Sequence, residues 1–344
     1  MAGTYVGTTV LESDAIQAGL QPWIGPQGQV MKRLELHLTY TCPERCVFCS
    51  EEHRMQSYRP FQVTWGRVAT VLRKHAARGI DSIHITGGEP TIHPRFIDVL
   101  RMAKKLGMRT SVGTIGTMLS KRDFAVECLP WLDEALFSIH GPDAQTHDMM
   151  TRREGSFDQV TEALRLSTEI KPEFNAFVNT VMTRYNVDKL PGTVALVEKL
   201  GAKLIIVSNT TPEGNAFDVY KDLAVPLADL KRILPNIPPI LSKATVRFFG
   251  VPMCMLGDFQ MYSNDLHWDP RVTVEWRSEP GKVLFDGIYS WAPDRRRLHP
   301  DECEPCTLKK VCMGVYDKYA ELWPTVDLAP QLGAPDSSLA AARP

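Results

Sequence analysis

The sequence predicts an α/β fold built on a parallel sheet, and two observations predict it. Between residues 34 and 208, short runs rich in β-branched and aromatic residues alternate with stretches of helical periodicity. Six such strand-helix units follow one another without interruption. Periodicity alone leaves two arrangements open, an open doubly wound sheet and a partial barrel.

The predicted strands are apolar runs that each precede a helical pattern. They cover residues 34–39, 82–86, 109–114, 134–140, 174–182 and 203–208. Two of the helices between them are well marked. In 64–78 the residues Val68, Val71, Leu72 and His75 recur on one face, and 156–170 begins at a Ser-Phe-Asp start signal.

The pattern changes after about residue 210. A Pro-rich stretch at 236–243 and a hairpin pattern at 272–287 with a Pro-Gly turn predict a smaller α+β unit that also carries clustered cysteines. The tail is rich in Ala, Pro, Gly and Ser, which predicts mobility. We therefore expect four parts: a lead-in at 1–30, a core domain at 31–235, an appended domain at 236–326 and a flexible tail at 327–344.

Composition narrows the class of protein. Lys plus Arg number 39 against 40 for Asp plus Glu, so the chain of 344 residues has no basic field to hold nucleic acid. We also expect no membrane partner, because no apolar stretch approaches the roughly 20 residues that cross a bilayer. The first residues lack a secretory pattern, which predicts a cytoplasmic protein. In that reducing compartment the 8 cysteines are expected to be metal ligands or catalytic thiols.

Three cysteines stand together directly after the first predicted strand. Cys42, Cys46 and Cys49 form the run CPERCVFC. One interpretation is a zinc loop completed by a distant histidine. The other is a [4Fe-4S] cluster held at three of its irons, which leaves the fourth iron open to a substrate.

A second motif, TGGEP at 86–90, closes the second predicted strand. The two glycines allow the backbone to approach a ligand, and Glu89 can accept a hydrogen bond from an ammonium group. Taken alone, the same residues could form an ordinary β-turn.

Four further cysteines lie in the second half of the chain. Cys303, Cys306 and Cys312 form CEPCTLKKVC, and Cys254 precedes the predicted hairpin. Four thiolates can fully bind either a second [4Fe-4S] cluster or a tetrahedral zinc ion. The eighth cysteine, Cys128, lies among apolar residues of a predicted helix and is expected to be a buried thiol.

Two further groups of side chains carry weaker signals. His37 and His84 project from predicted strands, where a hydrogen-bonded core imidazole is the commoner role. The run Arg295, Arg296 and Arg297 could meet an anionic substrate, although a solvated turn is the commoner case.

The CxxxCxFC run, followed one unit later by GGEP, resembles the signature of the radical S-adenosylmethionine (SAM) superfamily over roughly residues 34–215. The resemblance implies a partial (β/α)6 TIM-type barrel. It also implies that SAM binds the open iron of the cluster held by Cys42, Cys46 and Cys49. Reductive cleavage of SAM would then give a 5'-deoxyadenosyl radical, which removes a hydrogen atom from the substrate.

The same resemblance assigns SAM contacts. Gly87, Gly88 and Glu89 stand where the family binds the SAM amine. Phe48 stands beside the adenine, although core packing is an equally good interpretation of this aromatic. The other assigned contacts are Ser138 with Arg152 or Arg153 for the carboxylate, and Asn179 near the ribose and adenine. At the end of the third predicted strand, many members of the family carry an Asn-Gly pair that contacts SAM. This sequence has Ile115 in place of the Asn, so that polar contact is missing.

The second cysteine set resembles the twitch or SPASM appendage of this superfamily. That resemblance implies an auxiliary [4Fe-4S] cluster bound by Cys254, Cys303, Cys306 and Cys312. Full SPASM domains have further cysteines, and none follows Cys312 in this sequence. The sequence therefore favours a twitch-like domain with one auxiliary cluster, which could accept an electron from the substrate radical.

These features predict a radical SAM enzyme, an oxidoreductase or lyase that receives electrons from a donor such as flavodoxin or ferredoxin. Only 33 residues precede the first strand, which is too few for the recognition domain that peptide maturases commonly carry. We therefore expect a small polar metabolite as substrate: a sugar, aminocyclitol, nucleoside or cofactor precursor that is oxidised, decarboxylated or loses a group in a biosynthetic pathway. The alternative is a maturase of a ribosomally made peptide. A third hypothesis, from another class, is a non-catalytic protein with zinc sites.

Overall fold

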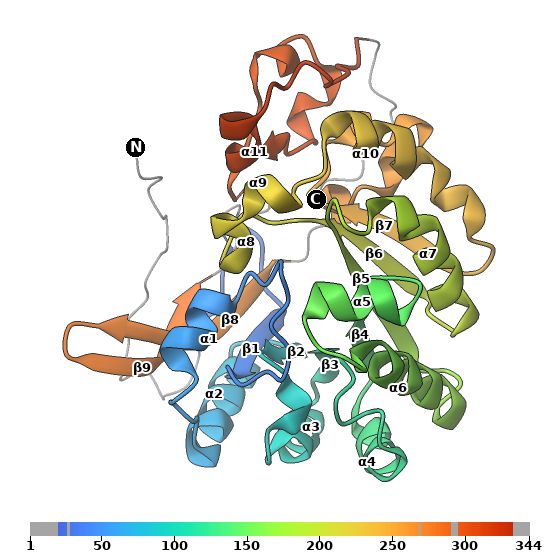
Figure 1. Cartoon of the computed structure of the whole chain (residues 1–344). Coiled ribbons are helices and arrows are strands. Elements are labelled where there is room, and N and C mark those ends of the chain that lie inside the picture. The colour runs from blue at the N-terminus through green and yellow to red at the C-terminus, as the bar shows by residue number, and fades with distance from the viewer. Residues whose placement is uncertain (1–19, 26–27, 268–269, 290–294, 333–344) are drawn as a thin grey trace.

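The computed structural model of the chain describes residues 20–25, 28–267, 270–289 and 295–332, with side chains omitted for 286–289. Within these ranges the main feature is a sheet of nine strands in the order β7-β6-β5-β4-β3-β2-β1-β8-β9 (Figure 1). Its strands are β1 (Arg33–Thr39), β2 (Ser82–Gly87), β3 (Arg109–Thr114), β4 (Glu134–Ser138), β5 (Asn175–Met182), β6 (Leu204–Asn209), β7 (Thr245–Phe249), β8 (Arg271–Glu279) and β9 (Lys282–Tyr289).

The strand order decides between the two arrangements that periodicity leaves open. Strands β1 to β7 lie side by side in chain order and every neighbouring pair is parallel. A doubly wound sheet would reverse its order at an internal switch point, and this sheet does not. The predicted partial TIM-type barrel is therefore confirmed.

Helices cover the outer face of the curved sheet (Figure 1). The barrel helices are α2 (Trp65–Ala77), α3 (Phe96–Lys105), α4 (Arg122–Cys128), α5 (Ala144–Thr151), α6 (Ser156–Ile170) and α7 (Leu190–Lys199). Short helices follow the cysteine run and the last predicted strand: α1 (Glu52–Tyr58), α8 (Asn215–Asp218), α9 (Tyr220–Leu223) and α10 (Leu227–Ile233).

The two faces of the strands differ in chemistry, and β1 shows why. Its alternate residues Leu34, Leu36 and Leu38 are buried against the helices. The residues between them, Glu35 and His37, point to the inner face, because successive side chains of a strand alternate. The outer layer thus supplies an apolar core, and the inner face offers polar side chains to a site.

The sheet extends further along the chain than the predicted core domain. Strand β7 pairs in parallel with β6, and β8 pairs in parallel with β1 on the other side of the barrel. The predicted hairpin at 272–287 exists as β8 and β9, and it belongs to the barrel sheet instead of the appended domain. The barrel therefore has eight parallel strands where six were expected, and its sheet runs past the boundary predicted at residue 235.

A small unit follows the hairpin and lies above the barrel in Figure 1. It contains the two-stranded sheet β10 (Arg297–Leu298) and β11 (Val315–Tyr316) and the helix α11 (Asp317–Leu322). Residues 327–332, expected to start the mobile tail, pack onto this unit. Leu328 is buried, and the N–H of Thr307 donates to the carbonyl of Gln331 at 2.9 Å. The rest of the predicted tail, 333–344, lies outside the described residues.

The described part of the lead-in covers helix α2. Trp23 is buried, stacks on His75 and donates its Nε1–H to His75 Nδ1 at 3.0 Å. Residues 1–19 lie outside the described part of the chain. Among the described helices, none is both long and apolar enough to cross a bilayer.

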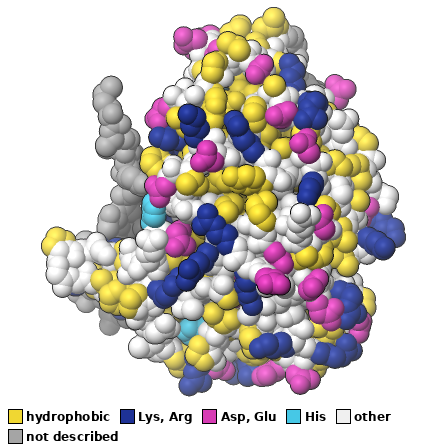
Figure 2. All heavy atoms as spheres, viewed as in Figure 1, with side chains coloured by type: hydrophobic (Ala, Val, Ile, Leu, Met, Phe, Trp, Pro, Cys, Tyr) yellow, Lys and Arg dark blue, Asp and Glu magenta, His cyan; other side chains and the backbone are white. Residues whose placement is uncertain are grey.

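Charged side chains of both signs are interspersed over the face shown in Figure 2. This mixture agrees with the formal net charge of -1 and leaves no broad basic field on that face.

The first turn of α6 is capped by a side chain from the preceding helix. The turn has no capping side chain of its own, and Asp148 of α5 supplies the cap. This carboxylate accepts hydrogen bonds from the N–H groups of Gly155 and Phe157 at 2.7 and 2.8 Å and from the Ser156 hydroxyl at 2.9 Å. Burial raises the pKa of Asp148, and these bonds outweigh it, so the pKa falls below its usual value.

We expect Asp148→Ala to lower the free energy of unfolding by about 1 kcal/mol at pH 7. Because the folded pKa is depressed, this stabilisation is present above the unfolded pKa of about 3.9 and is lost as pH falls through the folded pKa. Urea unfolding of both proteins between pH 3 and 7, followed by circular dichroism, measures the difference. If the difference in the free energy of unfolding between the two proteins stays constant down to pH 3, the charge of Asp148 does not contribute to the cap.

Candidate functional site

The cysteine run lies at the carboxyl end of β1, in the loop that leads to α1. Cys42, Cys46 and Cys49 are free thiols and are close enough that each thiolate charge would disfavour ionisation of its neighbours. Burial raises the pKa of Cys42 and of Cys49 to about 12 and raises that of Cys46 as well. Such thiols lose their protons when a metal binds them.

The GGEP turn after β2 fixes one side of this loop. The N–H of Gly88 donates to the carbonyl of Thr39 at 2.6 Å, and that of Glu89 to the carbonyl of Thr41 at 2.8 Å. A Cβ atom at Gly87 would lie 2.1 Å from Thr39 O, and one at Gly88 would lie 2.3 Å from Thr41 O. The two glycines are therefore needed because this turn packs directly on the backbone that leads into Cys42.

Helix α5 fixes a second side of the loop. The N–H of Arg45 donates to the carbonyl of Thr151 at 3.1 Å, and the N–H of Val47 to that of Met150 at 2.9 Å. These two bonds hold the middle of the cysteine run against the end of α5.

The loop after β6 fixes the third side. Asn215 N donates to Cys49 O at 2.9 Å, and its side-chain amide donates to Val47 O. A Cβ atom at Gly214 would lie 2.5 Å from Cys49 O. The contact between this segment and the cysteine loop joins residues more than 160 positions apart and could not be read from the sequence.

Glu89 is fully buried, and its carboxylate is already satisfied. It accepts hydrogen bonds from Thr91 N at 3.2 Å and from the Thr91 hydroxyl. It also accepts from the Thr114 hydroxyl at 2.7 Å and from Ile115 N at 2.8 Å. Burial raises the pKa of Glu89, and these donors oppose the rise. The carboxylate therefore ties the GGEP turn to the end of β3.

Ser138 and Asn179 lie side by side on the inner face, in register on β4 and β5. The hydroxyl of Ser208 on β6 donates to Asn179 Oδ1 at 2.6 Å. These residues form a polar row near the carboxyl ends of three neighbouring strands.

The structure separates the two candidate arginines. Arg152 is exposed and ends α5 in the left-handed conformation with φ of 54°. Arg153 turns inward, where its NH2 group donates to Gln159 Oε1 at 3.0 Å. Its NH1 group is buried and has no hydrogen-bond partner among the described residues. Arg153 is thus the better placed of the two to bind an anion.

Phe48 packs edge-on against His140, with ring centroids 4.5 Å apart. His140 Nδ1 accepts a hydrogen bond from Val181 N at 3.1 Å, so a neutral ring carries its proton on Nε2. Burial lowers the pKa of His140 well below its ordinary value, which keeps the ring neutral. The histidine of this pair was not singled out by the sequence.

The second cysteine set also converges, although Cys254 and Cys303 are 49 positions apart in the chain. The thiol of Cys303 interacts electrostatically with those of Cys312, Cys254 and Cys306. The sulfur of Cys312 accepts hydrogen bonds from Met253 N and Gly314 N, both at 3.4 Å. Backbone donors of this kind stabilise a thiolate.

The spacing of the sulfurs bears on which metal they fit. Thiolates around one zinc ion lie roughly 3.8 Å apart, from a Zn–S distance of about 2.3 Å. Within the described residues, the only trio of His, Cys, Asp or Glu ligand atoms found within 4.8 Å of one another is His37, Glu51 and Glu275. Among the described residues, neither cysteine set brings three of its sulfurs within that distance of one another.

The trio at His37 forms an ion-pair network. Arg54 lies 3.0 Å from Glu51 and 3.3 Å from Glu275, so a cation already pairs with both carboxylates. Burial lowers the pKa of His37, and the hydrogen bond with Glu35 and the neighbouring acids outweigh it and raise the pKa. His84 is a hydrogen-bonded core imidazole, as expected, with Nδ1 2.9 Å from Ser111 Oγ.

The remaining sequence candidates have structural roles. Cys128 is completely buried, as expected. The arginine run braces the small unit instead of forming a solvated turn. Arg295 pairs with Glu213 at 2.9 Å, Arg296 with Asp317 at 3.2 Å and Arg297 with Asp265 at 3.3 Å.

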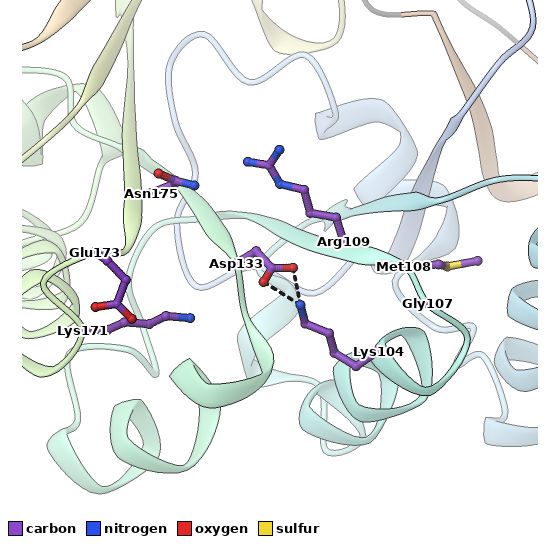
Figure 3. A pocket seen from close by; sticks show the side chains of 8 residues that line it. All are labelled: Lys104, Gly107, Met108, Arg109, Asp133, Lys171, Glu173 and Asn175. Carbon is purple, nitrogen blue, oxygen red and sulfur yellow. Dashed lines mark hydrogen bonds and ion pairs between the residues drawn. The ribbon is translucent and has the colours of Figure 1, made fainter.

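A separate pocket opens at the amino ends of β3, β4 and β5, away from the cysteine loop (Figure 3). Lys104 pairs there with Asp133, and Lys171 donates to the carbonyl of Leu132 at 3.0 Å. Because these cations are already paired and the cysteines lie at the opposite end of the strands, this pocket is not the candidate site.

Comparison with known proteins agrees with this geometry. A family model described as "Radical SAM superfamily" matches residues 36–197. The PqqA peptide cyclase of Methylorubrum extorquens (strain PA1) is 30% identical over 184 residues, which are 52% of this chain and 46% of that protein. A "Probable GTP 3',8-cyclase" of Thermoplasma volcanium is 27% identical over 291 residues, 83% of this chain and 78% of that protein. The chain thus spans about half the length of the PqqA peptide cyclases that it matches.

Solved structures share the fold. Streptococcus suis SuiB bound to precursor peptide SuiA superposes with a TM-score of 0.60 at 15% identity, over 88% of this chain and 75% of that chain. The protein anSMEcpe with bound AdoMet and Cp18Cys peptide gives 0.57 at 15% identity, over 87% and 93%. At these identities the likeness concerns the fold.

The close packing of the GGEP turn on the backbone leaves no room for a side chain at Gly88. Gly88→Ala places a methyl group against Thr41 O and should lower the free energy of unfolding by roughly 1–3 kcal/mol. The matched control is Gly66→Ala in α2, where an added Cβ meets nothing within 4 Å and should stabilise the helix by about 0.5–1 kcal/mol. Thermal unfolding of the two variants compares them. Equal stability of both would show that the turn does not pack as described.

Proposed function

This chain is a member of the radical SAM superfamily through residues 36–197, and we propose that it is an enzyme of that superfamily that modifies a peptide. The observation that carries the proposal is the cysteine loop, in which three half-buried thiols are held by main-chain hydrogen bonds from three sides. A superfamily cluster bound at this loop, together with SAM, supplies a 5'-deoxyadenosyl radical that can remove a hydrogen atom from a substrate.

We assign Cys42, Cys46 and Cys49 as the ligands of the SAM-binding [4Fe-4S] cluster. Their loop offers three sulfurs and, within the described residues, no fourth cysteine beside them. One iron would therefore remain open to SAM. The clamped backbone would fix the three sulfurs before the cluster binds.

The SAM contacts follow from the polar groups around this loop. Phe48 and His140 offer a flat apolar edge and a ring N–H donor for the adenine. Ser138 and Asn179 offer hydroxyl and amide groups on the inner face. To the carboxylate, Arg153 offers a buried guanidinium nitrogen that has no hydrogen-bond partner within the described ranges. Gly87 and Gly88 shape the turn beside Cys42, and Glu89 holds that turn to β3 as a positioning residue.

We propose that Cys254, Cys303, Cys306 and Cys312 bind an auxiliary [4Fe-4S] cluster in a twitch-like unit. Their convergence and the backbone donors to Cys312 support this assignment. Four thiolates would leave no iron open, so an electron-accepting role is favoured over direct substrate binding. An external reductant such as flavodoxin or ferredoxin would supply electrons to the first cluster. Eight free cysteines suit the reducing environment of the cytoplasm.

The comparisons favour the peptide alternative over the small polar metabolite. The relatives named PqqA peptide cyclase share the barrel sequence at 30% identity, and structures with bound peptides share the fold. A second candidate is a nucleotide substrate, because the relative named as a probable GTP 3',8-cyclase matches a larger share of this chain.

Iron content tests the two cysteine sets separately. Wild-type protein purified without air should be brown and hold about eight irons per chain. We expect the combined change of Cys42, Cys46 and Cys49 to Ala to leave about four irons and to abolish SAM cleavage. Cys306→Ala should leave the first cluster and SAM cleavage measurable while it abolishes product formation. A colourless wild-type protein that contains zinc would contradict both assignments.

The substrate class can be tested by isotope transfer. With SAM and a strong reductant, the enzyme should move deuterium from a fully deuterated candidate precursor peptide into 5'-deoxyadenosine. Deuterated GTP is the parallel probe under the same conditions. Transfer from GTP alone would favour the nucleotide candidate, and transfer from neither, in cluster-loaded protein, would count against both.

A further inference from the structure

Arg247 lies in the middle of β7 and faces the inside of the barrel. Its neighbours on the strand, Val246 and Phe248, are buried in the main core. Because successive side chains of a strand alternate, Arg247 points to the opposite, inner face, where it is half-buried. A guanidinium group keeps its positive charge at neutral pH. The inner face therefore carries a fixed cation on a strand that the sequence had not assigned to the barrel.

This cation has no counter-ion among the residues that the structure describes. No hydrogen bond or ion pair joins the side chain of Arg247 to any of them. Burial lowers the pKa of Arg247, and no described carboxylate opposes that shift. Other arginines of the inner face differ. Arg33 pairs with Glu134 at 3.4 Å, and Arg271 pairs with Glu35 at 2.9 Å. Arg247 is therefore available to bind an anion that enters the barrel.

The register of the sheet relates Arg247 to the proposed SAM contacts. Ser138 of β4 is in register with Asn179 of β5. Asn179 is in register with Ile206 of β6, and Ile206 is in register with Arg247. These residues form one row across the inner face. Since neighbouring strands are about 4.8 Å apart, the backbone of Arg247 lies roughly 10 Å from that of Asn179. A substrate bound at Arg247 would therefore lie next to SAM.

Apolar side chains surround this cation on the inner face. Ile206 is its neighbour on β6, and Phe249 follows two positions later on the same side of β7. Phe177 and Leu204 are paired in the next row toward the amino ends of the strands. All four are half-buried and so offer apolar surface to the interior. In such surroundings a hydrogen bond between a guanidinium group and an anion is stronger than on an exposed surface.

The opposite side of the barrel carries negative charge. Glu35 of β1 pairs with Arg271, and Glu275 of β8 pairs with Arg54 at 3.3 Å. Their carboxylates would repel a second anion, which is a form of selection against a wrong orientation. A substrate with one anionic group would therefore turn that group toward β7.

Building on the proposed function, we propose that Arg247 is a specificity-determining residue that binds a carboxylate of the peptide substrate. The carboxylate can belong to an Asp or Glu side chain or to the C-terminus of the peptide, and a guanidinium group binds either of them through two parallel hydrogen bonds. An extended chain advances about 3.3–3.6 Å per residue, so a span of roughly 10 Å places this carboxylate within about three residues of the one that loses hydrogen.

Selection from a random peptide library tests the proposal by binding, without use of turnover. Short synthetic peptides, with either a free or an amidated C-terminus, are selected on cluster-loaded wild-type protein with SAM bound. Selected peptides should be rich in Asp and Glu, or should come from the library with the free C-terminus. The first result assigns the carboxylate to a side chain and the second to the terminus. Binders without any carboxylate would overturn the proposal.

Fluorescence anisotropy then compares the selected peptides on variants. In Arg247→Gln, each peptide should bind roughly tenfold to a hundredfold more weakly, and Arg247→Lys should recover part of the loss. Replacing the carboxylate of the peptide by an amide should weaken binding to the wild type by a similar factor and should have no further effect in Arg247→Gln. The matched control is Arg73→Gln, which removes the same charge from an exposed position on α2, outside the barrel (Figure 1), and should leave affinity unchanged.

Thermal unfolding and iron content separate this role from a structural one. Because Arg247 has no partner to lose among the described residues, Arg247→Gln should hold the same iron as the wild type and unfold at the same temperature or higher. A lower unfolding temperature would reveal a structural partner and contradict the proposal.

The remaining outcomes distinguish this proposal from the proposed function. Equal binding of the selected peptides to wild type and Arg247→Gln would overturn the role of Arg247 while the proposed function stands. Failure of cluster-loaded wild type to select any peptide would overturn both the role of Arg247 and the peptide as substrate. Binding of GTP instead, weakened in Arg247→Gln, would assign the cation to a phosphate group and overturn the carboxylate.

Discussion

The backbone clamp around the cysteine loop is the constraint on which the rest of the site depends. The loop carries few apolar residues of its own, and its shape comes from hydrogen bonds with the turn after β2, the end of α5 and the segment after β6. Each of these segments follows a different strand, so the loop is correctly placed only when the sheet has formed in its full order. The glycines at 87, 88 and 214 permit this closeness, since any side chain there would collide with a carbonyl oxygen of the loop.

Burial by this clamp has an electrostatic consequence. Burial leaves the charged forms of the three thiols poorly solvated, and a charge on Glu44 or Glu89 raises the pKa of the nearby thiols further. Ionisation of all three therefore depends on a cation, and a cluster of iron ions supplies one. The loop is thus preorganised in shape and, without metal, held in a protonated state. This coupling ties the binding of metal to the finished fold.

The sequence predicted the strands and helices of the barrel closely because each carries a local pattern. The predicted strand 109–114 and helix 156–170 agree with the structure at both ends. The sheet continues past the core boundary expected at residue 235, because the places of β7 and β8 in it depend on strands that are far away in the chain. The role of Glu89 was open for a similar reason. The sequence shows which residues form the GGEP turn. It does not show that Thr114 and Ile115, from the next strand-helix unit, donate hydrogen bonds to the Glu89 carboxylate. The inward turn of Arg153 and the exposure of Arg152 also depend on the path of the chain after α5.

The extension of the sheet also explains how the two cysteine sets share one scaffold. Cys254 follows β7 after only a few residues, so it is placed by the same edge of the sheet that places the first cysteine loop after β1. The side-chain amide of Asn209 at the end of β6 donates to Gly250 O at 3.1 Å, and the hydroxyls of Thr211 and Tyr316 lie 3.2 Å apart. Tyr316 belongs to the small unit, and it packs where a side chain at Gly250 would stand. The small unit is therefore fastened to the carboxyl ends of β6 and β7 by direct contacts. Because parallel strands bring all their carboxyl ends to one edge, Cys254 after β7 and the first cysteine loop after β1 lie at the same end of the barrel.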